Sequence, residues 1–404
     1  MLKNKKIILG ITGGIAAYKI PEMIRLFRKA GADVTVILTE AGEKFVSPLV
    51  CEILSENPCL TDMFATIKDQ RIAHTSEGCG ADLIVVAPAT ANSISKIACG
   101  IADNLLLTTI TASDCPVLVA PSMHAKMYLN PILQENIRKL ESLGRYRFVE
   151  PETGELAGGD TGQGRLPPVE EIFETALGML TLKCLKGRKV LVTAGPTREH
   201  IDPVRVITNP SSGKMGFAIA KVAKRMGACV TLVSGPVALK KPCADEYIRV
   251  ETAEEMLKAV EEKIREDSPD ILLMAAAVAD EQVAAPAKEK IKKGEFKRSL
   301  ELKPAPDILL SVKDLMKGKI VVGFAAETEN VIENARRKMA EKGLTLIFAN
   351  QVGSDAGFAK DTNSGYLIDS HGTTFKVEEM HKEDAAMFIL EKAAHLLNGQ
   401  DAGK

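Results

Sequence analysis

A glycine-rich turn near the start of the chain could hold a phosphate. Residues 10–17 (GITGGIAA) follow an apolar run and lead into a segment with helical spacing. Such a turn exposes backbone N–H groups at a helix start, where an anion is stabilised. The G-x-G-x-x-G spacing of a dinucleotide site is missing, and the next apolar run ends in Thr39 instead of an acid. The turn therefore predicts either a site for one terminal phosphate, shared with Thr39, or a purely structural turn.

Three further segments of the first half carry side chains that suit binding or catalysis. Residues 87–93 (APATANS) end an apolar run with small and hydrogen-bonding groups, beside which a flat polar ring could lie. His74 precedes that run and is either a structural histidine or a base, because imidazole titrates near neutral pH. Residues 121–128 (PSMHAKMY) are either a ligand-binding loop or a capped loop with buried methionines.

The second half has two candidate anion sites. Residues 193–199 (TAGPTRE) and 209–216 (NPSSGKMG) bracket one strand-to-helix connection. The Ser-Ser-Gly-Lys start resembles a P-loop, but Thr208 stands where that motif needs a glycine, so any anion must bind in another geometry. Residues 288–298 (KEKIKKGEFKR) follow an apolar strand and Asp280. They predict either a solvated charge run or a flexible flap that closes over a polyphosphate.

Alternating strands and helices position these loops. In the first half we predict strands at 5–11, 34–38, 82–87 and 116–120 and helices at 15–30 and 169–182. Residues 150–168 are rich in glycine and proline, and we expect a mobile flap or loop without regular structure there. In the second half, residues 194–213 are expected to be a loop. The other elements expected there are strands at 189–193, 229–233, 270–275, 320–324 and 345–349, helices at 214–226, 253–266, 329–342 and 382–398, and a hairpin at 365–377.

The order of these elements predicts the fold class. Apolar strands that alternate with helices indicate parallel sheets covered on both faces. The pattern restarts after residues 183–188, so we predict an α/β protein with two tandem doubly wound (flavodoxin-like or Rossmann-like) domains, residues 1–183 and 187–404. In such folds ligands bind at the carboxyl ends of the strands, where the loops described above lie.

The composition is that of a globular cytoplasmic protein. The 404 residues are 46% hydrophobic and carry a formal net charge of -1, which argues against binding nucleic acid or anionic lipid by bulk electrostatics. The longest apolar run, 271–279, is shorter than the roughly 18 residues that cross a bilayer. The eight cysteines and six histidines show no metal-binding spacing, so we expect reduced thiols and no protein-only metal site.

Taken together, these motifs resemble one family, the bifunctional phosphopantothenoylcysteine decarboxylase/phosphopantothenate-cysteine ligases of coenzyme A biosynthesis. The first half is similar to decarboxylases that use flavin mononucleotide (FMN) through GITGGIAAYK, APATAN, His74 and PSMHAKM. The second half is similar to the ligases through AGPTRE, DPVR, ITNPSSGKMG, AAAVAD, KIKK, GFAAET and LIFAN. The resemblance runs nearly end to end.

The resemblance implies two reactions. The ligase joins 4'-phosphopantothenate to cysteine, with CTP and Mg2+, through an acyl-cytidylate and with release of pyrophosphate. The decarboxylase then converts 4'-phospho-N-pantothenoylcysteine to 4'-phosphopantetheine. In that step FMN accepts a hydride from the cysteine Cβ, carbon dioxide leaves, and the hydride is returned. The implied domains are 1–183 for the decarboxylase and 187–404 for the ligase.

For the first half, the resemblance implies His74 as the base that removes the thiol proton, and His124 and Met123 as substrate-binding residues. Two departures matter. His124 stands where many family members have Asn, and Gly158 stands where others have a cysteine that protonates the enethiolate. Asp160, Arg165, a nearby cysteine or water could replace that cysteine. The positions implied to bind FMN are Gly13, Gly14, Ile15, Thr39, Thr90, Ala91, Asn92 and Ser93.

For the second half, the resemblance implies that Asn209 and Arg205 stabilise the acyl intermediate and that Lys290 acts on the nucleotide. Many family members have an aromatic residue after the position of Asp280, and this chain has Glu281 there. The resemblance therefore implies no contact of an aromatic ring with the nucleotide at that position. Mg2+ is expected to arrive with CTP. The positions implied to bind CTP are Met274, Ala275, Ala276, Asp280, Lys290, Pro306, Asp307, Phe324, Lys338 and Lys342.

Two other functions stay open on the sequence. One is a nicotinamide-dependent oxidoreductase, against which the missing dinucleotide fingerprint counts. The other is a ligase whose flavin-binding half has decayed into a regulator, suggested by Gly158. The family resemblance also implies a homo-oligomer, with trimers through the decarboxylase domain and dimers through the ligase domain.

Overall fold

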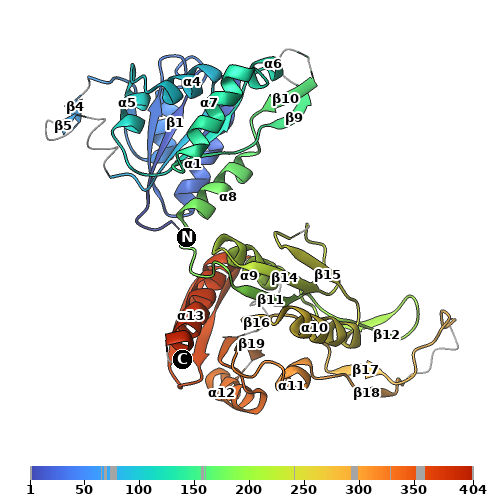
Figure 1. Ribbon diagram of the computed structural model, residues 1–404. Coiled ribbons are helices and arrows are strands. Elements are labelled where there is room, and N and C mark those ends of the chain that lie inside the picture. The colour runs from blue at the N-terminus through green and yellow to red at the C-terminus, as the bar shows by residue number, and fades with distance from the viewer. Residues whose placement is uncertain are drawn as a thin grey trace. The chain divides into compact units, whose positions relative to one another are not determined.

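The computed structural model describes residues 2–64, 66–67, 71–72, 80–155, 159, 161–240, 242–292, 299–327, 329–351 and 360–402. The chain divides into two compact units, Met1–Thr181 and Leu182–Lys404. Each unit contains its own large β-sheet with helices on both faces (Figure 1). The predicted α/β fold class is confirmed.

The first unit is built on a six-stranded parallel sheet in the order β3-β2-β1-β6-β7-β8. Counted along this sheet, the order is 3-2-1-4-5-6, that of the Rossmann fold, and it reverses between β1 and β6. The loops after β1 and β6 therefore diverge and leave a crevice between them. The strands are β1 (Lys6–Ile11), β2 (Asp33–Leu38), β3 (Cys59–Leu60), β6 (Leu83–Ala89), β7 (Val117–Pro121) and β8 (Tyr146–Phe148).

Helices bury both faces of this sheet. One face packs on α1 and α8, where the Phe27 and Phe173 rings meet edge to face with centroids 5.2 Å apart. The other face packs on α4, α5 and α7. The helices are η1 (Ile15–Lys19), α1 (Ile20–Lys29), α2 (Pro48–Ser55), α4 (Ala91–Cys99), α5 (Leu105–Thr111), α6 (Ala125–Tyr128), α7 (Pro131–Ser142) and α8 (Val169–Leu180).

Two predictions for this unit were wrong. The helix expected at 15–30 is split into a 3-10 turn and α1, because Pro21 at the start of α1 has no N–H for the helical hydrogen bond to residue 17. The flap expected at 150–168 contains a hairpin, β9 (Glu152–Glu155) and β10 (Thr161–Arg165), which pair antiparallel. A small pair, β4 (Thr66–Ile67) and β5 (Arg71–Ile72), was also not predicted.

The second unit has an eight-stranded sheet in the order β15-β14-β11-β16-β19-β20-β21-β22. The first six strands are parallel and repeat the 3-2-1-4-5-6 order, and β21 and β22 add an antiparallel edge. The strands are β11 (Lys189–Ala194), β14 (Cys229–Ser234), β15 (Glu246–Arg249), β16 (Ile271–Met274), β19 (Ile320–Glu327), β20 (Leu346–Gln351), β21 (Thr362–Asp369) and β22 (Thr374–His381).

The helices of this unit also form two layers. One face of the sheet packs on α9 and α13, and the other packs on α10, α11 and α12. In Figure 1, α9 and α13 lie side by side. The helices are α9 (Lys214–Arg225), α10 (Ala253–Asp267), α11 (Ile308–Val312), α12 (Val331–Lys342) and α13 (Lys382–Ala402).

Two short hairpins project from the loops of this unit. The first joins β12 (Arg198–His200) to β13 (Val206–Thr208), so the prediction of a plain loop at 194–213 was wrong. The second joins β17 (Glu281–Val283) to β18 (Leu302–Pro304) and forms the base of the basic segment 288–298, of which residues 293–298 lie outside the described part of the chain. β17 and β18 pair across residues 284–301, and β12 and β13 are three residues long each, so neither hairpin leaves a clear local signal.

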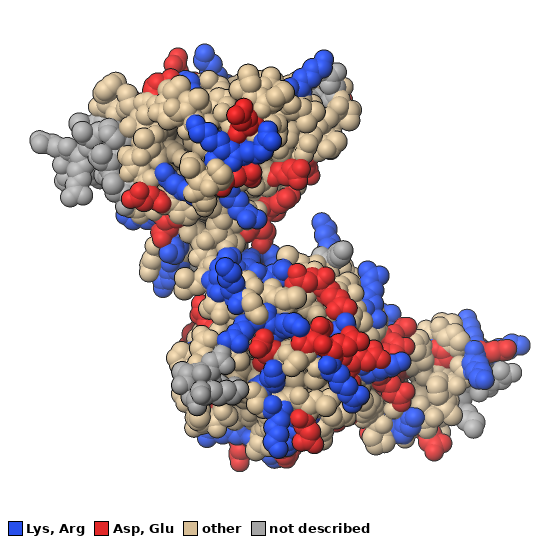
Figure 2. Space-filling model, viewed as in Figure 1, with Lys and Arg blue, Asp and Glu red and all other residues tan. Residues whose placement is uncertain are grey.

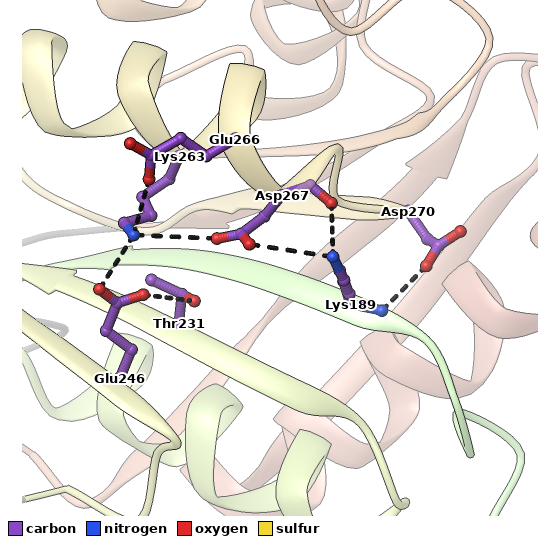
Figure 3. Close-up of polar contacts among 7 residues, drawn as sticks. All are labelled: Lys189, Thr231, Glu246, Lys263, Glu266, Asp267 and Asp270. Atoms are coloured by element: carbon purple, nitrogen blue, oxygen red, sulfur yellow. Dashed lines mark hydrogen bonds and ion pairs between the residues drawn. The ribbon is translucent and has the colours of Figure 1, made fainter.

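Ion pairs and hydrogen bonds connect charged side chains at the end of the second sheet where its parallel strands begin. The Lys263 ammonium lies 3.0 Å from a carboxylate oxygen of Glu246 and 3.0 Å from one of Glu266, and these contacts raise its pKa (Figure 3). Asp270 accepts the backbone N–H of Lys189 at 2.8 Å. This end of the sheet lies opposite the strand ends where ligands bind in such folds, so we assign the cluster to stability.

The molecular surface mixes charges of both signs. On the face drawn in Figure 2, basic and acidic side chains are interspersed over the second unit, in keeping with the formal net charge of -1. Within the described residues, no helix combines the length and apolar character needed to cross a membrane. The described residues also contain no cluster of three or more His, Cys, Asp or Glu that could hold a metal ion.

Candidate active sites

A cavity of about 980 Å³ opens at the carboxyl ends of β1, β2, β6 and β7, and we call it the Gly13 cavity. It brings together all eight positions implied to bind FMN, and Met123 and His124 also line it. His74, Gly158 and Asp160 lie outside the described residues. The implied FMN positions in its lining are Gly13, Gly14, Ile15, Thr39, Thr90, Ala91, Asn92 and Ser93.

The loops after β1 and β6 are bonded to each other at the floor of the Gly13 cavity. The Thr12 hydroxyl donates to the Pro88 carbonyl at 2.7 Å and accepts the Thr90 N–H at 3.1 Å. A Cβ on Gly13 would lie 2.4 Å from the Ala41 Cβ, so only glycine lets this turn approach the loop after β2 so closely. The result is a backbone-lined cradle of the kind that binds a phosphate.

Two hydroxyl side chains shape the same cradle. Thr90 begins α4 and its Oγ1 accepts the Ser93 N–H at 3.3 Å, while the Thr90 and Ser93 hydroxyls are 3.1 Å apart. Thr39 donates to the Ile11 carbonyl at 3.3 Å and accepts the Gly42 N–H at 3.2 Å. Both hydroxyls are thus held in place by the backbone around them.

The β9–β10 hairpin forms another wall of the Gly13 cavity. The Met123 N–H donates to the Gly164 carbonyl at 2.9 Å, and a Cβ on Gly164 would lie 2.1 Å from the Met123 oxygen. A Cβ on Gly162 would lie 2.6 Å from the Ala125 Cβ. Two glycines at alternate positions therefore form one flat face that lies against the 123–125 loop. This alternation is the sequence signal that could have revealed the strand.

Charged groups of both signs line the Gly13 cavity. The cations are Lys19, Lys96 and Arg165, the anions are Glu40, Asp103 and Glu155, and Lys96 pairs with Asp103 at 2.6 Å. Of the cations, Lys19 and Lys96 were not predicted from the sequence. His124 begins α6, and its Nδ1 accepts the Lys126 N–H at 3.2 Å, which places the proton of the neutral ring on Nε2.

A second cavity of about 600 Å³ lies at the carboxyl ends of β16, β19 and β20, beside the segment that leads into α9, and we call it the Asn209 cavity. Asn209 lines it, but Arg205 and Lys290 are not among its lining residues, and Lys290 is exposed. The implied CTP positions that line it are Met274, Ala275, Ala276, Asp280, Pro306, Asp307, Phe324, Lys338 and Lys342.

The loop at 275–280 is held by the two threonines that flank the turn after β11. The Ala276 N–H donates to Thr193 Oγ1 at 3.2 Å, and the Ala279 N–H donates to Thr197 Oγ1 at 3.0 Å. Asn209 fixes the same loop from the other side, because its Nδ2 donates to the Val278 carbonyl at 3.0 Å. A backbone held in this way offers fixed N–H and carbonyl groups to the edge of a flat base.

Two lysines of α12 line the Asn209 cavity. Burial and the neighbouring Lys342 ammonium lower the pKa of Lys338, whose Nζ donates to the Phe324 carbonyl at 3.2 Å. Lys342 pairs with Asp307 at 2.9 Å. Burial opposes ionisation of Asp307, but the Lys342 ammonium and the Leu310 N–H outweigh it and lower the pKa of Asp307.

Asp202 and Arg205 form hydrogen bonds with Ile291, the residue that follows Lys290. The Asp202 side chain is fully buried and accepts the backbone N–H groups of Val204 and Arg205 at 2.8 Å each. It also accepts the Ile291 N–H at 3.3 Å, and Arg205 Nη2 donates to the Ile291 carbonyl at 3.2 Å. The DPVR segment therefore anchors the residue beside Lys290, a contact that sequence spacing does not reveal.

The start of α9 completes the Asn209 cavity. Gly213 precedes the helix with a left-handed φ of +75°, and Ser211, Ser212 and Lys214 line the cavity beside it. A Cβ on Gly216 would lie 2.5 Å from the Ala194 Cβ, so this glycine allows the helix to pack closely on β11. The start of α9 lines the cavity although its sequence is not a P-loop. Ser211, Ser212 and Lys214 belong to the segment 209–216, which the sequence predicts as part of a candidate anion site.

Comparison with known proteins agrees with this arrangement. The family model Flavoprotein matches residues 1–181, and the model of the DNA/pantothenate metabolism flavoprotein C-terminal domain matches residues 185–397. The Coenzyme A biosynthesis bifunctional protein CoaBC of Bacillus subtilis is 43% identical over 401 residues, which are 98% of this chain and 98% of that protein.

The chain belongs to the CoaBC family. The CoaBC protein of Mycobacterium tuberculosis is 42% identical over 414 residues and covers 98% of this chain and 97% of that protein. The crystal structure of the C-terminal domain of a CoaBC protein is 38% identical, covers 54% of this chain and 99% of that chain, and has a TM-score of 0.46. The full-length relatives and the two family models confirm the predicted family. The chain is a flavoprotein and a bifunctional decarboxylase and phosphopantothenate-cysteine ligase of coenzyme A biosynthesis.

Proposed function

We propose that residues 1–183 carry an FMN-dependent decarboxylase that acts on 4'-phospho-N-pantothenoylcysteine, and that residues 187–404 carry a CTP-dependent ligase that makes this compound from 4'-phosphopantothenate and cysteine. The observation that supports this division most strongly is that each unit has its own cavity at the switch point of its own sheet. The Gly13 cavity gathers the positions implied to bind FMN, and the Asn209 cavity gathers Asn209 and the positions implied to bind CTP except Lys290.

FMN is proposed to bind in the Gly13 cavity. The cradle formed by Gly13 and Gly14 fits a terminal phosphate, and Lys19 lines the same cavity. The 980 Å³ volume lies in the range of cofactor pockets. When bound, FMN would supply the redox chemistry that makes carbon dioxide a possible leaving group.

The protein's own residues would then orient the substrate and move protons. His74 is proposed to take the thiol proton of the substrate. His124 and Met123 are proposed to hold the substrate, with the imidazole donating to its carboxylate or amide. The β9–β10 hairpin lies against the 123–125 loop and lines the cavity with Arg165, so it would exclude water from the reacting carbon.

CTP and Mg2+ are proposed to bind in the Asn209 cavity. Asp280 and Asp307 line it with carboxylate oxygens, which are the ligands Mg2+ prefers, and Lys338 and Lys342 suit the phosphates. Asn209 would place the 275–280 loop against the base and the activated carboxylate. Activation is needed because a carboxylate becomes an electrophile only when its oxygen leaves with a phosphate.

An oligomer and a cytoplasmic location complete the proposal. Trimers through the first unit and dimers through the second are implied by the family resemblance. The exposed apolar side chains of α2, with Leu49 62% and Ile53 67% exposed, support a contact surface on the first unit.

Product analysis tests the proposed function. The purified protein is incubated with 4'-phosphopantothenate, cysteine, CTP and Mg2+, its flavin spectrum is recorded, and products are identified by mass. We expect 4'-phosphopantetheine, carbon dioxide and one pyrophosphate per turnover, and no product when CTP is omitted. Accumulation of 4'-phospho-N-pantothenoylcysteine with no carbon dioxide would instead mean that the flavin unit is a regulator.

A further inference from the structure

Two helices of the second unit begin with a lysine that lines the Asn209 cavity. Lys214 is the first residue of α9, and Lys382 is the first residue of α13. A positive charge at the start of a helix is unfavourable, because the positive end of the helix dipole lies there. Neither lysine belongs to the positions that the family resemblance implies for CTP.

Lys382 is a buried cation. Only 8% of its surface is exposed, and its Nζ donates to the Lys360 carbonyl and to the Thr362 carbonyl, the latter at 3.3 Å. An ammonium group has three N–H donors, so these carbonyls leave one donor over. Lysine is rarely buried without an ionic partner, because removing its charge from water is costly. The part of the chain that the structure describes supplies this charge with carbonyl oxygens but with no carboxylate in an ion pair.

Asp361 connects the two lysines. Its carboxylate pairs with Lys214 at 2.7 Å, and its backbone carbonyl accepts the N–H of Lys382 at 2.9 Å. The carbonyls that Lys382 Nζ contacts belong to the residues on either side of Asp361. Burial and the Lys214 ammonium lower the pKa of Lys382. Two cations are thus held around one short segment, and its single carboxylate can balance only one of them.

The start of α9 adds backbone donors to this group. No side chain caps α9, and its first turn holds no acidic residue. The first N–H groups of a helix have no partner within the helix, and they stabilise an anion. Ser211 and Ser212 line the cavity beside them. Ammonium groups, helix N–H groups and hydroxyls together form a donor set that suits a phosphate group.

We propose that Lys382 and Lys214 bind a phosphate group of a ligase substrate at the start of α9. The proposal rests on the proposed function in one respect, namely that the Asn209 cavity holds the ligase substrates. Two sources carry the required chemistry: the terminal phosphates of CTP, which leave as pyrophosphate, and the 4'-phosphate of phosphopantothenate. Both offer charged oxygens that accept hydrogen bonds from ammonium groups.

Binding measurements test the proposal on the full chain with its flavin. Two probes, inorganic pyrophosphate with Mg2+ and 4'-phosphopantothenate, are titrated into the protein separately, and the heat of binding gives each Kd. Lys382→Met removes the charge and keeps an unbranched side chain. We expect it to bind at least one of the probes about 10 to 150-fold more weakly, the value of one charge-assisted hydrogen bond. Lys382→Arg keeps the charge and should lose less.

The two probes distinguish the sources of the phosphate group. Weaker binding of pyrophosphate alone assigns the lysines to the nucleotide, and weaker binding of 4'-phosphopantothenate alone assigns them to the second substrate. Lys214→Met should weaken the same probe as Lys382→Met, and it carries the test if Lys382→Met does not fold. Unchanged binding of both probes by the folded variants would overturn the proposal.

Lys224→Met is the matched control. Lys224 also lies on α9 and pairs with an aspartate, Asp245, at 2.7 Å, and its side chain is 30% exposed compared with 33% for Lys214. It does not line the Asn209 cavity. Lys224→Met should therefore bind both probes as the unsubstituted protein does. A loss as large as that of Lys214→Met would contradict a specific role for the two proposed lysines.

A purely structural role of Lys382 predicts a different result. If Lys382 only holds the start of β21 through the two carbonyls, its substitution should weaken cytidine and pantothenate, which carry no phosphate, as much as the phosphorylated probes. Such equal losses would overturn the proposal. The titrations need no turnover. A chain that binds a probe through Lys382 but forms no amide from phosphopantothenate, cysteine and CTP would contradict the proposed function and leave the phosphate site in place.

Discussion

The side-chain amide of Asn209 donates to the backbone carbonyl of Val278 at 3.0 Å and faces the Ala277 carbonyl at 3.3 Å. One side chain thus joins the segment after β13 to the loop after β16. Both segments line the same cavity. An amide nitrogen donates hydrogen bonds and a carboxylate oxygen cannot. An amide at position 209 therefore holds the two segments together, whereas a carboxylate there would repel the two carbonyl oxygens.

Asn209→Asp is expected to lower amide formation by the ligase on the order of 10 to 150-fold, since a carboxylate that faces acceptors forgoes the hydrogen bonds of a charged group, each worth about 1.5 to 3 kcal/mol. The new carboxylate faces two carbonyl oxygens and stands beside the developing negative charge. We expect the acyl-cytidylate to form and accumulate. Pyrophosphate release without cysteine, followed by cysteine addition, separates the two steps, and normal completion of the amide would contradict the assignment.

If Lys290 binds the nucleotide as the family resemblance implies, Lys290→Gln is expected to slow formation of the acyl-cytidylate by a similar order, about 10 to 150-fold, the value of one charge-assisted hydrogen bond. Lys292→Gln, an exposed lysine two positions away, is the matched control and should change little. Pyrophosphate release measures both. Equal rates for the two variants would show that the basic segment is only a solvated charge run.

Gly164→Ala is expected to displace β10 from the 123–125 loop, because its Cβ would stand 2.1 Å from the Met123 carbonyl oxygen. Decarboxylation should fall by at least about tenfold, the loss expected when a wall of the site moves by an ångström or more. Ligase activity should be unchanged. The control is Gly178→Ala in α8, whose Cβ meets nothing within 4 Å and which should keep both activities.

Glu383→Gln is expected to destabilise the second unit at pH 7. Glu383 pairs with Lys221 at 2.8 Å and Arg225 at 2.7 Å, and although burial opposes its ionisation, these cations lower its pKa. A carboxyl with a lowered folded-state pKa stabilises above its unfolded pKa, about 4.3, and this contribution is lost as the pH falls through the folded-state pKa.

The melting temperatures of the unsubstituted protein and Glu383→Gln should therefore differ at pH 7 and converge as the pH is lowered below about 4. Glu378→Gln is the control, because the Glu378 to Lys376 pair is exposed and such pairs contribute little. A difference that stays constant from pH 7 to pH 3 would show that the effect of Glu383→Gln is one of packing rather than charge.

Local patterns were enough to predict the sheets. The apolar runs that became β1, β6, β11 and β16 are buried on both faces, and a parallel strand in this position has to be apolar throughout. The motifs that follow these strands also identified the family, because each motif sits where its strand ends. The α/β fold class and the family were therefore readable from the chain alone.

Long-range contacts decided what the sequence could not predict. Gly162 and Gly164 look like loop residues until the 123–125 loop lies against them and leaves room for no side chain. Asp202, Arg205 and Ile291 come together only because the β12–β13 hairpin folds toward the segment before 293. Sequence determines which side chains a segment can bury or expose, but contacts between distant segments depend on packing that no local spacing encodes.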